Sequence, residues 1–427
     1  MEEFIKTLTE QIRCVRAREG VARELSNHII DQTEAYERTG MTHDQALERA
    51  VHEMGDPVEI GISMDRIHRP QTDWKMLVLT VFLSAAGLVC MIPVFGINYI
   101  ISRQLIFTLA GFGVIIAVYF LDYSILGRTG IAAGMILTGI FLLGKHYYFQ
   151  TINGRIPAMS SLVYLYVPIF AGILYQLRKK KAKAVILAIG TIGIICMLTF
   201  YFSHSLTVAG NIFLCMIVLL IASVAKGMFG KGKKYIARCI GFVVILLTVF
   251  FGWLFWSNRD SLHVLRLVAF FNRNQYQEAE GYFYKIIRDV LYGSKLIGTG
   301  NIAYFDDYYF PGLKEGGLVP LVIIYRFGFI VGIVLLLLLI GFILRAIHIV
   351  YRQKNQLGVL VSLACFLVLG VNCVEGVLIS VGLFPITTAA IPFLTHGGST
   401  VLVYAVLIGL LFSVHRREKI LTQEVME

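Results

Sequence analysis

The stretch Trp74–Val94, WKMLVLTVFLSAAGLVCMIPV, decides the fold class of this chain. It contains one charged side chain, Lys75, beside its first residue, and is otherwise apolar or weakly polar. A helix needs about 20 such residues to cross the hydrocarbon core of a bilayer, at about 1.5 Å per residue. Because backbone groups in lipid must be hydrogen-bonded within the segment, this stretch is expected to be a membrane-spanning helix.

Similar runs recur along the chain and predict an all-α, polytopic membrane protein. The 427 residues are 57% hydrophobic and only 15% charged, whereas soluble domains carry about 25% charged residues. We predict about ten transmembrane helices, and their even number places both termini on the same side of the membrane. The predicted spans are 74–94, 103–121, 128–145, 159–177, 184–202, 207–225, 236–256, 318–344, 357–380 and 397–414.

The polar stretch Ser257–Gly317 separates the seventh and eighth predicted spans. If every run crosses the membrane, this loop is the only sizeable folded part on its side. Water-dependent chemistry is therefore expected in the loop or where it meets the helix ends. Its basic residues are Arg259, Arg266, Arg273, Lys285, Arg288, Lys295 and Lys314, and its acidic residues are Asp260, Glu278, Glu280, Asp289, Asp306, Asp307 and Glu315.

Clusters of basic residues predict the orientation. They lie within Arg178–Lys183, Lys226–Arg238, Arg345–Lys354 and Arg416–Lys419, which all fall on one side if every run crosses. Loops rich in Lys and Arg stay in the cytoplasm, so we expect cytoplasmic termini and an outer loop at 257–317. The net charge of +11 then reflects this rule and contact with anionic lipids, and it requires no nucleic acid.

Residues 1–70 differ in character and predict a small cytoplasmic helical module without a catalytic constellation. No signal peptide is expected, because the first apolar run begins only at Trp74. Within residues 1–70, the stretches Gly40–Ala46 and Met54–Pro57 resemble the helical prefix domains of some bacterial membrane proteins. This resemblance suggests an interaction or folding module. Apolar spacing predicts helices in Met1–Arg18, Glu19–Arg38 and Thr42–Met54, with a capping box at Thr42 and Gln45 and a further helix start at Asp56-Pro57.

Some kinds of chemistry find no support in the sequence. The seven cysteines include no Cys-x-x-Cys pair and no Cys/His cluster, and none lies in the loop 257–317. Neither a disulfide framework nor a metal site is therefore predicted. The absence of a GxxxxGK[S/T] phosphate-binding loop argues against a transporter that hydrolyses ATP by itself.

Glu375 is the clearest polar residue inside a predicted span, and Asn372 lies three residues before it on the same helix face. Charged groups inside membranes are costly and often functional. Glu375 therefore has two interpretations. It is either a carboxylate of a substrate groove or proton pathway, or a hydrogen-bonded side chain that ties two helices together.

The segment Gly382–Thr400, GLFPITTAAIPFLTHGGST, carries the most specific pattern. Pro385 and Pro392 prevent a continuous helix, and the Gly397–Ser399 turn opens the last span with free N–H groups that suit a diphosphate. The alternative is a simple helix break and packing turn. As a pattern the segment is similar to the signature of the SEDS family, the FtsW/RodA/SpoVE proteins of bacterial cell-wall synthesis, and the resemblance covers residues 74–420.

The outer loop supports the same resemblance. Gly281-Tyr282, Gly293-Ser294 and Gly298-Thr299-Gly300 follow the spacing of the family's loop. Ile286-Ile287 departs from it, because the family has a Gln-Ser pair there.

The resemblance implies a function at the bacterial plasma membrane. SEDS proteins polymerise lipid II into glycan strands and release undecaprenyl diphosphate, usually beside a transpeptidase of the class B penicillin-binding proteins. The reaction needs a base for the acceptor hydroxyl, and positive groups or a divalent cation such as Mg²⁺ or Mn²⁺ for the departing diphosphate. The candidate substrate-binding residues are Arg266, Lys285, Arg288, Lys295, Gly397, Gly398, Ser399 and Glu375, although each basic one has the alternative of being a solvated surface charge.

The catalytic base is where the sequence departs from the family. The family's Asp at the start of the eighth helix falls on Gly317, counted back from Gly328-Phe329. Glu315 is the candidate replacement, and Asp306 and Asp307 are the other nearby carboxylates. The alternatives to a lipid II polymerase are an enzyme for a related lipid-linked sugar, a catalytically degenerate scaffold of wall synthesis, and a transporter of lipid-linked precursors.

Overall fold

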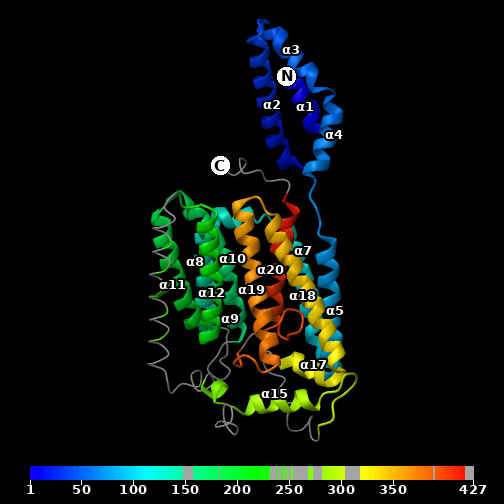
Figure 1. Cartoon of the computed structure of the whole chain (residues 1–427), viewed down its shortest axis with the longest axis vertical. Helices are drawn as coiled ribbons and strands as arrows, with labels where there is room; N and C mark the ends of the chain where they lie inside the picture. Colours follow the sequence, from blue (N-terminus) through cyan, green and yellow to red (C-terminus); the bar gives the residue numbers. More distant parts are fainter. Residues whose placement is uncertain are drawn as a thin grey trace. The chain divides into compact units, whose positions relative to one another are not determined.

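In the computed structural model, the described part of the chain is mostly helical, and no strand occurs there. The prediction of an all-α polytopic protein is confirmed (Figure 1). The chain divides into two compact units: Met1–Asp73 with short pieces at Arg352–Asn355 and from Val414 on, and the remaining residues of the membrane part. The described residues are 1–147, 157–180, 182–230, 268–272, 281–302, 318–387 and 390–418, with 237, 241, 244, 245, 248 and 252.

Nine helices within these ranges are long and apolar enough to cross a membrane. Seven of them match predicted runs closely, and the second and eighth predicted spans differ in their boundaries. The seventh predicted run, 236–256, lies almost entirely outside the described residues. The nine segments are Trp74–Phe95, Ile97–Phe120, Ser124–Lys145, Met159–Lys180, Lys183–Ser203, Leu206–Ala225, Phe329–Arg352, Gln356–Ser380 and Gly398–Arg416.

The predicted span 318–344 is wrong in its boundaries, because two helices share that apolar run. Helix α17 (Val319–Phe327) ends at Gly328, and α18 (Phe329–Arg352) is the membrane-spanning helix. Gly328 has a φ of 96°, which glycine adopts without strain and other residues rarely adopt. The break is invisible in the hydropathy because apolar residues lie on both sides of it.

The second span begins earlier than predicted and contains a π-helical turn. Helix α6 (Ile97–Tyr99) runs through η1 (Ile100–Gln104) into α7 (Leu105–Phe120). Such π turns are rare and are often found at functional sites. Here the turn ends at Gln104, whose side chain is buried.

Helix α10 (Tyr166–Leu177) lies at the centre of the membrane unit and is buried at all but one of its positions. It packs against α8 (Ser124–Tyr147), α12 (Leu206–Ala225) and α19 (Gln356–Ser380). The approach to α8 depends on Gly172, because a Cβ atom there would collide with the carbonyl oxygen of Leu126. Helix α10 also contacts η2 (Val163–Leu165), η3 (Arg178–Lys180) and α11 (Ala182–Ser203), and α9 (Pro157–Leu162) packs against α11.

The N-terminal unit contains four helices around a small apolar core, built on Leu8, Ile12 and Val21. Asp56 caps the fourth helix as predicted, since its carboxylate accepts the N–H of Val58 at 2.9 Å. Thr42 precedes the third helix, but its side chain makes no capping hydrogen bond. The break between the first two helices falls before Val15 and not after Arg18, and the bounds are α1 (Glu2–Glu10), α2 (Val15–Glu37), α3 (His43–Met54) and α4 (Pro57–His68).

Candidate functional site

The segment between α19 and α20 (Gly398–Arg416) re-enters the membrane unit. The carbonyl oxygen of Phe393 lies against Gly87 of α5 (Trp74–Phe95), so closely that a Cβ atom on Gly87 would collide with it. Gly87 lies about 12 Å before the end of α5, at about 1.5 Å per helical residue. The orange-red loop in Figure 1 accordingly lies among the helices and not beyond their ends.

The glycine turn at the end of this segment is held by Gln104. The Gln104 side chain donates to the carbonyl of Thr395 at 3.3 Å and accepts the N–H of Gly397 at 3.4 Å. Gly397 has a φ of 114°, and a Cβ atom on Gly398 would collide with the ring of Phe107. One of the N–H groups expected to bind an anion is therefore already occupied by a neighbouring side chain.

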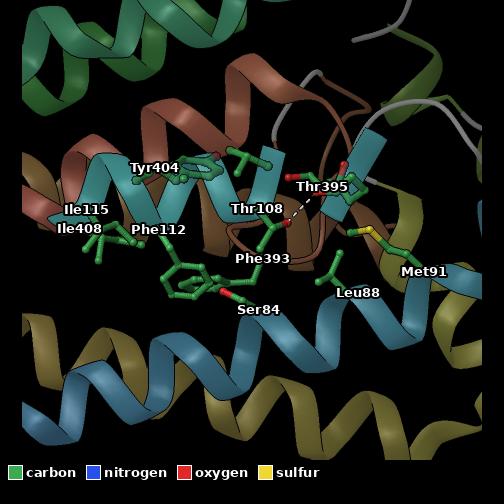
Figure 2. A pocket seen from close by; sticks show the side chains of 14 residues that line it. Ser84, Leu88, Met91, Thr108, Phe112, Ile115, Phe393, Thr395, Tyr404 and Ile408 are labelled. Atoms are coloured by element: carbon green, nitrogen blue, oxygen red, sulfur yellow. Dashed lines mark hydrogen bonds between the residues drawn. The ribbon is translucent and has the colours of Figure 1, made fainter. Parts of the chain in front are cut away.

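A small cavity of about 50 Å³ adjoins this turn (Figure 2). It has room for a few water molecules and not for a diphosphate. Its walls come from α5, α7, α20 and the re-entrant segment, with mostly apolar side chains such as Phe112 and Phe393. Thr395 lines the cavity, while Gly397–Ser399 do not.

Glu375 lies at the centre of a second polar cluster and is 5% exposed. One carboxylate oxygen accepts the side-chain N–H of Asn211 of α12, and the other accepts the hydroxyl of Thr387, each at 2.5 Å. The Asn211 amide also donates to the hydroxyl of Tyr164 at 3.4 Å. Asn372 instead donates within its own helix to the carbonyl of Val368. Glu375 thus joins α19, α12 and the re-entrant segment.

An open groove lies beside α15 (Tyr282–Gly293) and has a volume of about 520 Å³. That size is in the range of small-molecule sites. Lys285 and Arg288 line it from one side of α15, and Phe329, Val381 and Gly382 line it from the ends of α18 and α19. The structure therefore brings two of the predicted basic residues to one groove, next to the start of the re-entrant segment.

The sequence of α15 explains this arrangement. Its buried face, which includes Tyr284, Ile287 and Val290, packs in one apolar cluster with α17 and the end of α19. The hydroxyl of Tyr284 also accepts the N–H of Ile386 at 3.2 Å, which ties α15 to the re-entrant segment. Within the described part of the chain, Arg288 forms an ion pair with the adjacent Asp289 at 3.8 Å, and the Arg288 side chain is exposed. Such a pair contributes little energy, so Arg288 remains able to bind an anion.

Gly298 and Gly300, which belong to the family-like pattern of the loop, have a structural role. The N–H groups of Gly298 and Gly300 donate to the carbonyls of Phe327 and Tyr325 at the end of α17, at 3.1 and 2.8 Å. The carbonyl of Lys295 accepts the N–H of Phe329, the first residue of α18, at 3.0 Å. The Lys295 side chain is exposed and does not line the groove.

The predicted site residues thus fall in different places. Lys285 and Arg288 share the groove, whereas Glu375 belongs to the buried polar cluster. Gln104, Tyr164 and Asn211 could not be predicted from the sequence, because an isolated polar residue in an apolar run does not indicate its partner. Arg266, Asp306, Asp307, Glu315 and Gly317 lie outside the described residues.

The described residues contain no group of three or more His, Cys, Asp or Glu side chains that fits a metal ion.

Comparison with known proteins gives consistent matches. Residues 234–420 match the model of the FtsW/RodA/SpoVE family, described as cell cycle proteins. The probable peptidoglycan glycosyltransferase FtsW of Trichlorobacter lovleyi is 22% identical over 374 residues, covering 80% of this chain and 92% of that protein.

Two solved structures share the fold. One belongs to a peptidoglycan synthase complex that coordinates polymerization and crosslinking, with a TM-score of 0.61 and 16% identity over 81% of this chain and 98% of that one. The other is the rod shape determining protein RodA of Thermus thermophilus, with a TM-score of 0.51 and 14% identity over 81% of this chain and 97% of that one.

Proposed function

We propose that this chain is a member of the FtsW/RodA/SpoVE, or SEDS, family, whose model matches residues 234–420, and that it is a peptidoglycan glycosyltransferase that polymerises lipid II at the outer face of the plasma membrane. The groove beside α15 is the observation that carries the proposal. It combines two cations with an apolar wall at the end of two membrane-spanning helices. A lipid-linked sugar diphosphate presents the matching features, namely a negative diphosphate next to a polyprenyl chain.

Lys285 and Arg288 would act on the leaving group. Glycosyl transfer from lipid II develops negative charge on the departing diphosphate, and preorganised cations stabilise that charge in the transition state. The two residues lie three positions apart on α15, so both side chains reach one face of the helix. The guanidinium can bind two phosphate oxygens at once, while the Lys ammonium acts as a point charge.

The acceptor hydroxyl needs a base. Glu315 is our candidate, with Asp306 and Asp307 as the other carboxylates of the same loop. Gly317 occupies the place of the family's Asp, and this departure specifically favours the alternative of a catalytically degenerate relative that acts as a scaffold of wall synthesis. The similar synthase complex couples polymerization to crosslinking, and we propose a class B penicillin-binding transpeptidase as the partner of this chain as well.

The test is polymerisation of lipid II by the purified full-length protein, with and without a candidate transpeptidase, and with glycan products separated on a gel. We expect the double variant Lys285→Ala/Arg288→Ala to lose most of the product and the charge-conserving Lys285→Arg/Arg288→Lys to retain part of it. Lys226→Ala, which removes an exposed cation at the end of α12, should match the wild type. Glu315→Ala should abolish the product if Glu315 is the base.

Two outcomes would overturn the proposal. A wild-type protein that forms no glycan under any condition, with the partner present, would favour the scaffold. Movement of labelled lipid II across vesicle membranes without polymerisation would identify a transporter of lipid-linked precursors.

A further inference from the structure

The last turn of α15 and the residues that follow it carry an exposed apolar surface, which begins at Tyr292 on the rim of the groove and extends away from it. Tyr292, Leu296 and Ile297 are 85%, 72% and 73% exposed, and Lys295 beside them is also exposed. We refer to residues 292–297 as the tip. Exposed apolar groups gathered in this way, with a charged rim, mark surfaces that contact a membrane or another protein.

Hydrogen bonds fix the position of the tip relative to the membrane-spanning helices. The carbonyl oxygens of Lys295 and Leu296 accept the N–H groups of Phe329 and Ile330 at 3.0 and 3.1 Å. These two residues begin α18, which spans the membrane. The backbone of the tip therefore lies level with the end of a span, where the hydrocarbon layer meets the lipid headgroups.

The tip also continues the lipid-facing side of α18. Ile330, Ile333, Val334 and Leu337 are 47% to 61% exposed and recur at helical spacing, so they form one apolar stripe. Ile330 at the start of this stripe is the residue whose N–H binds the carbonyl of Leu296. Apolar surface thus extends from the stripe to the tip.

We propose that the tip inserts into the leaflet on its side of the membrane and holds α15 at the level of the lipid headgroups. Leu296 and Ile297 enter the acyl boundary, and the Tyr292 ring lies among the headgroups, where amphipathic rings are favoured. Lys295 extends its apolar stem along the acyl chains and places its ammonium beside anionic phosphates. A lipid-linked substrate can then reach the groove without leaving the leaflet; this consequence rests on the proposed function, whereas the insertion does not.

The test measures depth by electron paramagnetic resonance on the full-length protein in vesicles of phosphatidylethanolamine and phosphatidylglycerol. A spin label is attached to Ile297→Cys in a background in which Cys14 and Cys239 are replaced by Ser, and its collisions with oxygen and with a water-soluble nickel chelate are compared. Val334→Cys, on the α18 stripe, provides the lipid reference, and Asn27→Cys, exposed on α2, provides the water reference.

We expect the oxygen-to-nickel collision ratio at position 297 to be several-fold above the water reference and close to the lipid reference, with Tyr292→Cys between them. A ratio at position 297 equal to the water reference would overturn the insertion. Shielding of position 297 from both reagents would also overturn it and would show that protein covers the tip. Because the measurement needs no enzymatic turnover, its failure is distinguishable from failure of the proposed function.

Discussion

Glu375 is buried in the membrane unit, and both of its carboxylate oxygens accept hydrogen bonds. Asn211 and Thr387 each donate one hydrogen bond to it. Removal of a buried acceptor leaves its donors unsatisfied, which costs about 1–3 kcal/mol and more than the net contribution of the bond itself. The contribution of Glu375 to stability therefore resides mainly in the groups it satisfies.

We predict that Glu375→Leu lowers the free energy of unfolding by about 1–3 kcal/mol, whereas Glu375→Gln costs much less. A Gln amide can accept from Thr387 and, after a flip of the Asn211 amide, donate to its oxygen, so both contacts persist. Thermal unfolding of the purified variants in detergent would measure the difference. Equal losses in the two variants would show that the negative charge matters and not the hydrogen-bonded tie.

The sequence predicted Glu375 and not its partners, for a physical reason. A carboxylate in an apolar run stands out because its burial is costly. Asn211 lies 164 residues away along the chain, and a single amide in a span gives no information about the side chain opposite. Lys285 and Arg288 could be predicted as candidates because they lie in the polar loop, but only the packing of α15 shows that they share a groove.

At the scale of elements, the break between α17 and α18 organises the end of the membrane unit that carries α15. Gly328 turns the chain, and the segment Gly293–Ile302 satisfies the backbone groups left free on both sides of it. Hydropathy predicted the extent of the apolar run but not this break, since it reports length and apolarity and carries no information on φ. The same hydrogen bonds explain the structural role of Gly298 and Gly300, two glycines of the family-like loop pattern.

We predict that Gly328→Ala destabilises the protein strongly. A Cβ atom there would lie 2.5 Å from the carbonyl oxygen of Leu296, in addition to the strain of a positive φ. Gly341→Ala in α18 is the matched control, because a Cβ atom there meets nothing within 4 Å. An alanine in a helix interior is favoured over glycine by about 1 kcal/mol. The melting temperature should therefore fall in Gly328→Ala and rise in Gly341→Ala. An unchanged melting temperature in Gly328→Ala would contradict the turn at this position.

At the scale of the whole molecule, charge is divided unequally along the chain. Residues 1–73 carry 15 acidic and 9 basic side chains, whereas the rest of the chain carries 12 acidic and 29 basic ones. Asp65 is a buried carboxylate on α4 of the N-terminal unit. It accepts the backbone N–H of Arg13 at 2.8 Å and the guanidinium of Arg69 at 3.2 Å, and it thereby fixes the corner between α1 and α2 against α4.

These contacts predict a pH dependence of the N-terminal unit. The N–H of Arg13, with help from Arg69, lowers the pKa of Asp65 in the folded state. Its stabilising effect is therefore present above the unfolded-state pKa and is lost as the pH falls through the lowered folded-state pKa. Asp65→Asn keeps an acceptor and loses the charge, so it should cost about 1 kcal/mol at neutral pH.

Hydrogen exchange of the full-length protein, corrected for intrinsic rates, would show this loss as faster exchange in α1 and α4. Asp31→Asn, an exposed carboxylate on α2, should leave the exchange unchanged. Wild type and Asp65→Asn should converge as the medium is acidified. A difference in exchange between wild type and Asp65→Asn that persists at low pH would mean that the shape of the Asp65 side chain, and not its charge, stabilises the contact of α1 and α2 with α4.

The basic residues at the helix ends predict the orientation of the membrane unit. Helices α10, α12 and α18 end next to Arg178, Lys226 and Arg352, and the charge rule predicts that such ends lie in the cytoplasm. We therefore expect the opposite ends, including the start of α18 and with it α15, to face outward. We therefore predict that a membrane-impermeant maleimide labels Arg288→Cys in intact cells, because the Arg288 side chain is 56% exposed. Cys14, in the N-terminal unit, should react only after permeabilisation. The reverse pattern would invert the topology and remove the outer-face polymerase from consideration, since the groove would then open to the cytoplasm.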